Sequence, residues 1–167
     1  MRLVSFVLWV FLASCSHTYY VVRHAERATA APNMSSDVPL SDEGKQRAEN
    51  LKNLLHTKKV SEIFSTNTLR TRSTVQPTAD YFQLKTQLYG PRPDSAFIQS
   101  LKTKKKNVLV VGHSNTVDDI VNMLCGNQQV PGDLAETEYD NLFIVTKKGK
   151  KWTITRKKYG YPSNPEK

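Results

Sequence analysis

Two histidines and two arginines of this chain each follow a short apolar stretch: Arg23, His24, Arg70 and His113. Arginine suits a phosphate group because its planar guanidinium stays charged and donates two parallel hydrogen bonds. A neutral imidazole can accept a phosphoryl group and form a phosphohistidine, which water then hydrolyses. These residue types together indicate phosphoryl-transfer chemistry that needs no metal.

The elements that must position these residues can be predicted from apolar and β-branched patterns. Short strands are expected at 19–23, 62–65, 84–88 and 107–112, and a hairpin at 142–146 and 152–155 that turns at Gly149. Helices are expected at 41–55, 69–81, 94–101 and 116–124. The alternation of strand and helix predicts an α/β fold, a three-layer sandwich with a mainly parallel central sheet. Ligands bind at the carboxyl ends of the strands in such sheets, so the four residues should project from one edge.

Three local features refine these elements. Ser41 is typical of a helix N-cap, with acidic residues directly after it. Pro77 predicts a kink or an early break in the second helix. The fourth helix is expected to begin near Ser114 or Asn115, which would place free N–H groups and a positive dipole end beside His113.

Four segments resemble, in the same order, the motifs of the histidine phosphatase (phosphoglycerate mutase-like) superfamily. Residues 23–26 (RHAE) resemble the opening Arg-His-Gly motif, with Ala in place of Gly, and 40–44 (LSDEG) resemble the helix start that follows it. Residues 65–74 resemble the stretch with the next phosphate-binding arginine, and 111–115 (VGHSN) the motif of the second histidine. The resemblance extends from about Tyr19 to Thr146 and implies a phosphoglycerate mutase-like fold.

The resemblance implies a role for each site residue. His24 would be the nucleophile, and Arg23, Arg70 and His113 would bind the phosphoryl group. Arg72 is the competitor for the role of Arg70.

Three further residues belong near this predicted site. Ser114 is placed among the substrate-binding residues. Arg27 either edges the pocket or is simply solvated. Glu26 could form a salt bridge that orients an arginine.

The general acid is the least defined part of the predicted site. Only Asp80 and Asp94 lie between Thr71 and Gly112, and Asp80 falls inside a predicted helix. Asp94 is therefore named as the catalytic acid, although a helix N-cap role fits it equally well. The resemblance also implies an alternative, because short members that resemble the bacterial phosphohistidine phosphatases lack a dedicated acid altogether. This chain has no capping domain. The pocket should then be shallow and wet, which argues against a mutase that must shield its phosphoenzyme from water.

The N-terminal segment predicts export and lipid anchoring. Residues 1–14 read as a signal peptide, and 15–167 as the catalytic domain. Residues 12–15 (LASC) resemble a bacterial lipobox, which would place Cys15 at the new N-terminus for lipidation and anchor the protein in the cell envelope. The alternative is an ordinary secretory signal. A disulfide to Cys125 would then be possible, whereas otherwise Cys125 is expected to be a buried, unreactive thiol.

The formal charge of +9 predicts an anionic partner without choosing among a phosphorylated substrate, a lipid surface and nucleic acid. Lysines concentrate at 102–106 and 147–158, where solvated turns and edge strands are favoured over a nucleic-acid patch. The expected partners are therefore a phosphorylated small molecule or phosphoprotein, and a membrane through the lipid anchor. No nucleic acid is expected.

No metal and no cofactor are expected, because no Cys or His pattern with ligand spacing accompanies the two histidines. His17 and His56 have no partners in sequence and should be exposed. The predicted function is hydrolysis of phosphomonoesters, or of phosphohistidine, through a covalent phospho-His24. The alternatives are a non-catalytic anion-binding lipoprotein of the same fold and a phosphoglycerate mutase.

Overall fold

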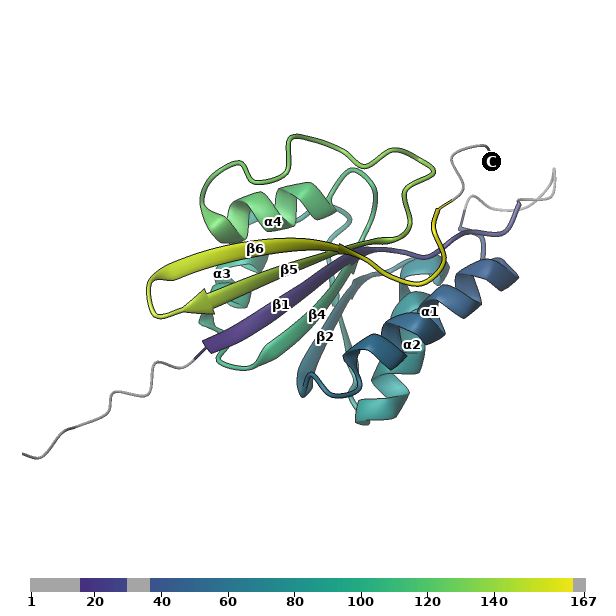
Figure 1. Cartoon of the computed structure of the whole chain (residues 1–167), viewed down its shortest axis with the longest axis horizontal. Coiled ribbons are helices and arrows are strands. Elements are labelled where there is room, and N and C mark those ends of the chain that lie inside the picture. The colour runs from purple at the N-terminus through teal and green to yellow at the C-terminus, as the bar shows by residue number, and fades with distance from the viewer. Residues whose placement is uncertain (1–15, 30–36, 164–167) are drawn as a thin grey trace, which may run out of the picture.

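One mixed sheet forms the centre of the molecule (Figure 1). The structure is a computed structural model that describes residues 16–29 and 37–163. The strands are β1 (Ser16–Arg23), β2 (Val60–Thr66), β3 (Thr86–Tyr89), β4 (Asn107–Gly112), β5 (Asn141–Lys148) and β6 (Lys151–Lys158). Their order is β3-β2-β4-β1-β5-β6. The pairs β3–β2, β2–β4 and β4–β1 are parallel, and β1–β5 and β5–β6 are antiparallel, so the mainly parallel sheet is confirmed.

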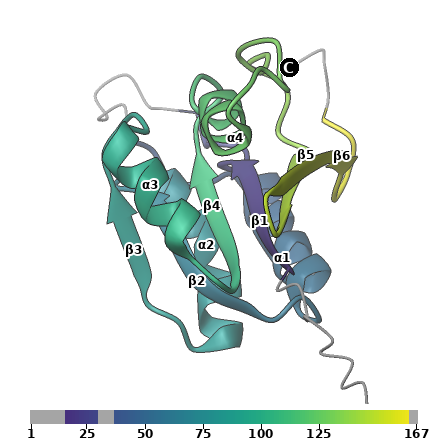
Figure 2. The same cartoon turned by 90° about the vertical axis from the view of Figure 1, so that its left-hand side faces the viewer.

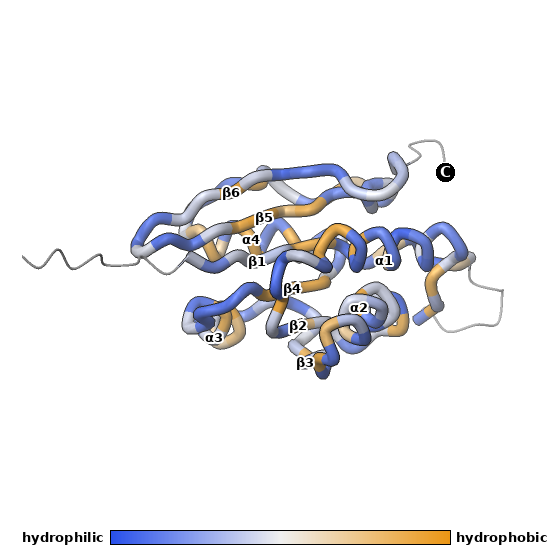
Figure 3. Tube along the Cα trace, turned by 60° about the horizontal axis from the view of Figure 1, so that its bottom comes forward, coloured by the Kyte–Doolittle hydropathy of each residue, from blue (hydrophilic) through white to orange (hydrophobic). Residues whose placement is uncertain are grey.

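Helices cover both faces of the sheet, as Figure 2 shows. The helices are α1 (Asp42–Leu55), α2 (Leu69–Phe82), α3 (Ser95–Thr103) and α4 (Val117–Cys125). One core cluster contains residues of α1 and α2, and another contains residues of α3 and α4. Hydrophobic stretches accordingly lie along the strands and on parts of each helix, with hydrophilic stretches between them (Figure 3). The expected three-layer sandwich is therefore what the chain forms.

The alternation of side chains along β1 shows how the two cores arise. Tyr19 and Val21 enter the core beneath α3 and α4, whereas Tyr20 and Val22 enter the core beneath α1 and α2. Successive side chains of a strand point to opposite faces. A strand that is apolar on both faces therefore belongs in the middle of the sheet, where β1 lies between β4 and β5.

Helix α1 begins where the sequence predicts, because Ser41 caps it and accepts a hydrogen bond from the Gly44 N–H. The Ser41 N–H donates to the Glu26 carbonyl at 3.0 Å. A Cβ on Gly44 would lie 2.1 Å from that same carbonyl oxygen. Only glycine permits this approach, which fixes the loop after β1 against the start of α1.

The prediction of an early break at Pro77 is wrong. Helix α2 continues past Pro77 to Phe82 and ends at Gln83, which adopts a left-handed conformation with φ of 55°. A proline removes one backbone donor, and the packing of Val75 and Ala79 in the core holds the helix across that gap.

The prediction that His17 is exposed is also wrong, whereas His56 is exposed as expected. The His17 side chain is buried on β1 and its Nε2 lies 3.1 Å from the Tyr19 hydroxyl. The hairpin turn at Gly149, with φ of 61°, is confirmed. None of the described helices is long and apolar enough to cross a membrane.

Candidate active site

The predicted site residues meet in one hollow of about 890 Å³ at the carboxyl ends of the parallel strands. Side chains reach it from the end of β1, the start of α2, and the segments 90–94, 113–115 and 133–136. All seven residues predicted from sequence line this hollow: Arg23, His24, Arg27, Arg70, Asp94, His113 and Ser114. Arg72 is exposed and bonded to Asn67, and it is not among the lining residues. The spatial convergence expected from the strand-end rule is present.

His24 is held with one ring nitrogen bound and the other available. Its backbone N–H donates to the Gly112 carbonyl at 2.9 Å, and its Nδ1 lies 2.8 Å from the Ala25 carbonyl. A carbonyl oxygen only accepts, so Nδ1 carries the hydrogen and Nε2 carries the lone pair. Burial lowers the pKa of His24 to about 3, with the nearby Arg23 charge adding to the effect. The ring is therefore neutral at physiological pH, as a nucleophile requires.

His113 faces His24, with the two ring centroids 5.4 Å apart. Its Nε2 lies 2.8 Å from the Thr66 hydroxyl oxygen. That hydroxyl donates to Thr71 at 3.1 Å, and the Thr71 hydroxyl donates to the Thr66 carbonyl at 2.8 Å. This chain of hydroxyls makes Nε2 the donor, and Nδ1 is left with a lone pair that lies 3.5 Å from an Arg70 nitrogen.

The same two arginines act on the pKa of His113 as on that of His24. Burial first, and then the charges of Arg70 and Arg23, lower the pKa of His113 to about 4. Both imidazoles are thus uncharged while two arginines beside them remain cationic. An anion that entered the hollow would meet fixed positive charge and two neutral rings.

Arg23 is almost fully buried at the end of β1 and only partly satisfied. One terminal nitrogen, NH1, donates to the carbonyls of Ala135 and Glu136 at 2.8 and 2.9 Å, and the other binds the Glu136 carboxylate at 3.0 Å. The Tyr139 ring lies against the guanidinium, 4.1 Å from its central carbon. The Nε–H has no hydrogen-bond partner among the described residues. A buried donor without a partner is costly, and it is suited to an oxygen of a bound ligand.

Arg70 is placed by the first turn of α2, which Thr68 caps. One terminal nitrogen lies 3.6 Å from a carboxylate oxygen of Asp37, and that oxygen also accepts from the Leu69 N–H at 2.8 Å. The second terminal nitrogen faces Nδ1 of His113. Asp37 therefore orients Arg70 toward the second histidine.

Glu136 is a site residue that sequence reasoning missed. One of its carboxylate oxygens binds Arg23, and the other accepts from the Ser114 hydroxyl at 3.0 Å. Burial acts to raise the pKa of Glu136, but the Arg23 charge and these hydrogen bonds outweigh it, so the pKa lies below its usual value. Its carboxylate is ionised at the mouth of the hollow and cannot serve as a proton donor at neutral pH. It lies on a loop without a motif, so the sequence held no signal for it.

The other acidic candidate, Asp94, caps helix α3 by accepting the Phe97 N–H at 2.7 Å, and it also lines the hollow. Both roles named from sequence are thus compatible with its position, and its function as the acid stays a prediction. Arg92 and Asp133 line the hollow as well and were not predicted.

The helix predicted at 116–124 is confirmed to within one residue at each end, as α4 spans Val117–Cys125, whereas a start as early as Ser114 or Asn115 is wrong. The N–H groups of Thr116 and Val117 both donate to the His113 carbonyl at 3.2 Å. Residues 114–116 form the turn that leads from His113 into α4, so the free N–H groups of the helix lie beyond Asn115.

A second cavity, of about 980 Å³, lies beside the hollow and shares Arg27 and Glu136 with it. Its walls come mainly from the start of α1 and from residues 136–139 and 161–162, and no histidine is among the lining residues described. The chemistry predicted from sequence therefore belongs to the smaller hollow. Within the described part of the chain, no cluster of His, Cys, Asp and Glu has the makeup of a metal site.

The first half of the described chain resembles a known protein family in sequence. Residues 19–89 match the sequence profile of the histidine phosphatase superfamily (branch 1). That match includes the segments of Arg23, His24 and Arg70 and ends before His113. No curated protein sequence matches the chain.

Solved structures resemble this fold over most of the chain. The protein histidine phosphatase SixA, in complex with tungstate, is 22% identical with a TM-score of 0.64, and the match covers 84% of this chain and 96% of SixA. The phosphoglycerate mutase of Bacillus anthracis is 16% identical with a TM-score of 0.62, covering 85% and 92%. A mycobacterial glucosyl-3-phosphoglycerate phosphatase is 10% identical with a TM-score of 0.55, covering 83% and 97%.

These structural matches establish the phosphoglycerate mutase-like α/β fold. The profile match over residues 19–89 is to the histidine phosphatase superfamily, and it lies within the part of the chain that has this fold.

Proposed function

We propose that this protein is a histidine phosphatase that hydrolyses phosphomonoesters, or phosphohistidine, through a covalent phosphohistidine on His24. The observation that carries the proposal is the meeting of His24, His113, Arg23 and Arg70 around one hollow. The superfamily match and the SixA-like fold agree with it. The reaction needs no cofactor, since every group it uses belongs to the chain.

The proposed reaction has two steps. The His24 Nε2 lone pair attacks phosphorus, the bond to the leaving oxygen or nitrogen breaks, and that atom takes up a proton. Water then attacks the phosphohistidine and gives a proton back to the group that protonated the leaving atom, while the N–P bond breaks and the Nε2 lone pair is restored. Arg70 and the unpartnered Nε–H of Arg23 stabilise the phosphoryl oxygens in both steps.

His113 has a supporting role in this proposal. Its Nε2 is committed to Thr66, so only Nδ1 faces the hollow. The charge of an arriving phosphate raises the pKa of His113, so that Nδ1 takes up a proton and donates to a phosphoryl oxygen. Asp94 remains the proposed source of the proton for the leaving group.

Turnover of a generic aryl phosphate tests the proposal. Replacement of His24 by Ala removes the nucleophile and should abolish turnover, while His56→Ala, an exposed histidine outside the hollow, serves as the matched control. Turnover that survives His24→Ala contradicts the phosphohistidine intermediate.

Two further outcomes of the same assays separate the alternatives. Vanadate or phosphate binding without turnover of any ester in a broad panel supports the non-catalytic anion-binding protein instead. Phosphoryl exchange between phosphoglycerates by a primed enzyme supports the mutase.

We further propose that the protein is exported and lipid-anchored through Cys15. The lipobox-like segment lies outside the described residues, and support comes from its sequence alone: an apolar stretch followed by LASC. Cys15→Ser should release the protein from sedimenting membranes. Sedimentation that persists in this variant contradicts the lipid anchor.

A further inference from the structure

Lysines gather at the end of the sheet opposite the candidate active site. They lie directly before three parallel strands and in the turn between β5 and β6: residues 58–59, 85, 105–106 and 148–151. All the lysines in these segments are exposed. We call this surface the basic face. The parallel strands bring it together, because their amino ends meet at one edge just as their carboxyl ends meet at the other.

Contacts in the structure show that these segments are neighbours. The Lys147 ammonium lies 3.4 Å from the Lys102 carbonyl, and the Asn107 side chain donates to the Lys58 carbonyl at 2.6 Å. Burial and then the charges of Lys147 and Lys105 lower the pKa of His17, which reports the local positive potential. The segments 58–59, 102–107 and 147–151 therefore lie next to one another at this end of the sheet.

Carboxylates do little to neutralise this patch. Glu62 is bound to Lys104 at 2.6 Å, and Asp80 accepts a hydrogen bond from Gln76 at the end of α2. Many of the other described acidic residues lie in the segments 37–43 and 133–140, at the active-site end. The basic face thus carries positive charge with few carboxylates beside it, whereas the active-site end carries charges of both signs.

The start of the fold lies within the basic face. Ser16 is the first residue of β1 and pairs with Lys148, and His17 pairs with Lys147. Cys15 directly precedes Ser16 in the sequence. A lipid on Cys15 would hold the basic face at the headgroups, and this step rests on the lipid anchor proposed above.

We propose that the basic face docks on anionic phospholipid headgroups and turns the active-site hollow away from the bilayer. Lysine ammonium groups are compact point charges that attract a negative surface without reading its structure. Trp152, an aromatic side chain in the β5–β6 hairpin, stacks on Tyr19 at 5.8 Å and lies under the Lys147 ammonium. It is therefore not available as a stacking platform, which favours lipid over nucleic acid.

Binding of the full chain to vesicles tests the proposal. The measured quantity is the ratio of partition into vesicles containing phosphatidylglycerol to partition into neutral phosphatidylcholine vesicles. An apolar anchor contributes to partition into both kinds of vesicle, so the ratio isolates the effect of charge. The ratio should be well above one at low salt and fall as salt screens the surface.

A pair of matched triple variants locates the effect. Lys105→Gln, Lys148→Gln and Lys150→Gln together remove three charges from the basic face. Lys45→Gln, Arg72→Gln and Lys157→Gln remove three exposed charges from other positions. Each lysine near an anionic surface contributes about fivefold, so the first triple should lower the ratio by up to roughly a hundredfold. The second should change it little.

Three outcomes would overturn the proposal. In the first, the ratio stays unchanged in the basic-face triple. In the second, the ratio falls equally in both triples, which would mean that net charge alone is responsible for the binding. The third is duplex DNA binding that the basic-face triple abolishes while the vesicle ratio stays unchanged. Phosphatase turnover in the basic-face triple should equal that of the parent, so this result is independent of the proposed catalytic function.

Discussion

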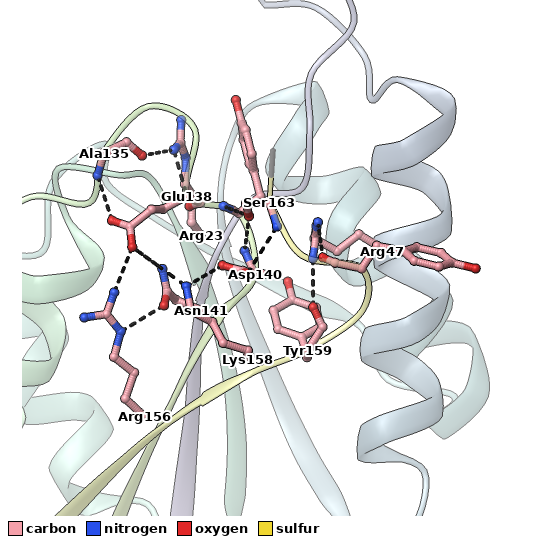
Figure 4. Close-up of polar contacts among 12 residues, drawn as sticks. Arg23, Arg47, Ala135, Glu138, Asp140, Asn141, Arg156, Lys158, Tyr159 and Ser163 are labelled. Carbon is pink, nitrogen blue, oxygen red and sulfur yellow. Dashed lines mark hydrogen bonds and ion pairs between the residues drawn. The ribbon is translucent and has the colours of Figure 1, made fainter. Parts of the chain in front are cut away.

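Two buried arginines, Arg23 and Arg47, show how the same residue type takes two roles in one fold. Arg47 lies on α1 and binds both carboxylate oxygens of Glu26 at 2.6 to 2.9 Å. Its terminal nitrogens also donate to the carbonyls of Tyr159 and Tyr161 at 2.8 and 2.9 Å. Figure 4 shows Arg47 beside Tyr159 and Arg23 beside Ala135.

Arg23 differs in what its donors meet. Its partner carboxylate, Glu136, is 72% exposed, whereas Glu26 is 21% exposed. Its Nε–H has no described partner, whereas each guanidinium nitrogen of Arg47 has one. An arginine paired on all sides ties segments together, whereas the buried donor left over on Arg23 fits the ligand-binding role proposed for it. The salt bridge expected for Glu26 is thus confirmed, and its partner is a structural arginine.

The largest expected effect is on stability, at Arg47. Arg47→Met leaves the half-buried Glu26 carboxylate and the two tyrosine carbonyls without their donor. Loss of one partner of a buried ion pair costs about 3–5 kcal/mol, so the free energy of unfolding should fall by that amount in denaturant titrations. A loss below about 1 kcal/mol, the size typical of surface pairs, would remove the distinction drawn between the two arginines.

The next effect is on anion binding, at Arg23. Arg23→Met should weaken vanadate inhibition by about 1.5–3 kcal/mol, roughly ten- to a hundredfold, because a charge-assisted donor is lost. Arg70→Met is the parallel variant and should weaken inhibition similarly. Vanadate inhibition that is unaffected by Arg23→Met would assign Arg23 to structure alone.

The two low histidine pKa values predict a pH effect on stability. The unfolded chain takes up protons on His24 and His113 below about pH 6.5, whereas the folded chain does so only near pH 3 to 4. Stability is therefore full above pH 6.5 and falls as pH drops toward 4, by up to about 1.4 kcal/mol per pH unit for each histidine.

The variant His24→Gln checks this slope. It should lose less unfolding free energy between pH 7 and pH 5 than the parent, measured without phosphate, because one of the two titrating rings is gone. Equal losses in both proteins would mean that His24 is not buried as a neutral ring.

The smallest effect is expected at Glu136. The Glu136 carboxylate accepts hydrogen bonds from Arg23 and Ser114, and both of these donors border the proposed anion site. Glu136→Gln removes a negative charge from the mouth of the hollow, so inorganic phosphate should inhibit a few-fold more strongly, as expected for a partly exposed charge worth under 1 kcal/mol. Weaker phosphate inhibition would mean that Glu136 mainly orients Arg23.

Much of the fold, and the gathering of Arg23, His24, Arg70 and His113 at one sheet edge, could be predicted because they depend on local pattern. The roles given to the site residues came from the resemblance to the superfamily. The strand 107–112 is bounded as predicted, and the caps at Ser41 and Asp94 follow from side chains that accept N–H groups one turn on. Apolar, β-branched segments followed by Arg, His or Thr-rich turns mark strand ends. In a parallel sheet those ends meet at one edge, so residues far apart in sequence could be assigned to one site.

Contacts between segments that have no sequence pattern of their own were decided only by the tertiary structure. Glu136 reaches the site because its loop is held from outside: Arg156 binds Glu138 at 3.0 Å, and the Ser163 hydroxyl accepts from the Asp140 N–H at 3.0 Å. The Thr66–Thr71 hydroxyls that orient His113, and the burial of Arg47, likewise depend on packing over long sequence distances. Sequence pattern encodes which face of an element is apolar, whereas the pairing of individual polar groups is settled only when the elements pack.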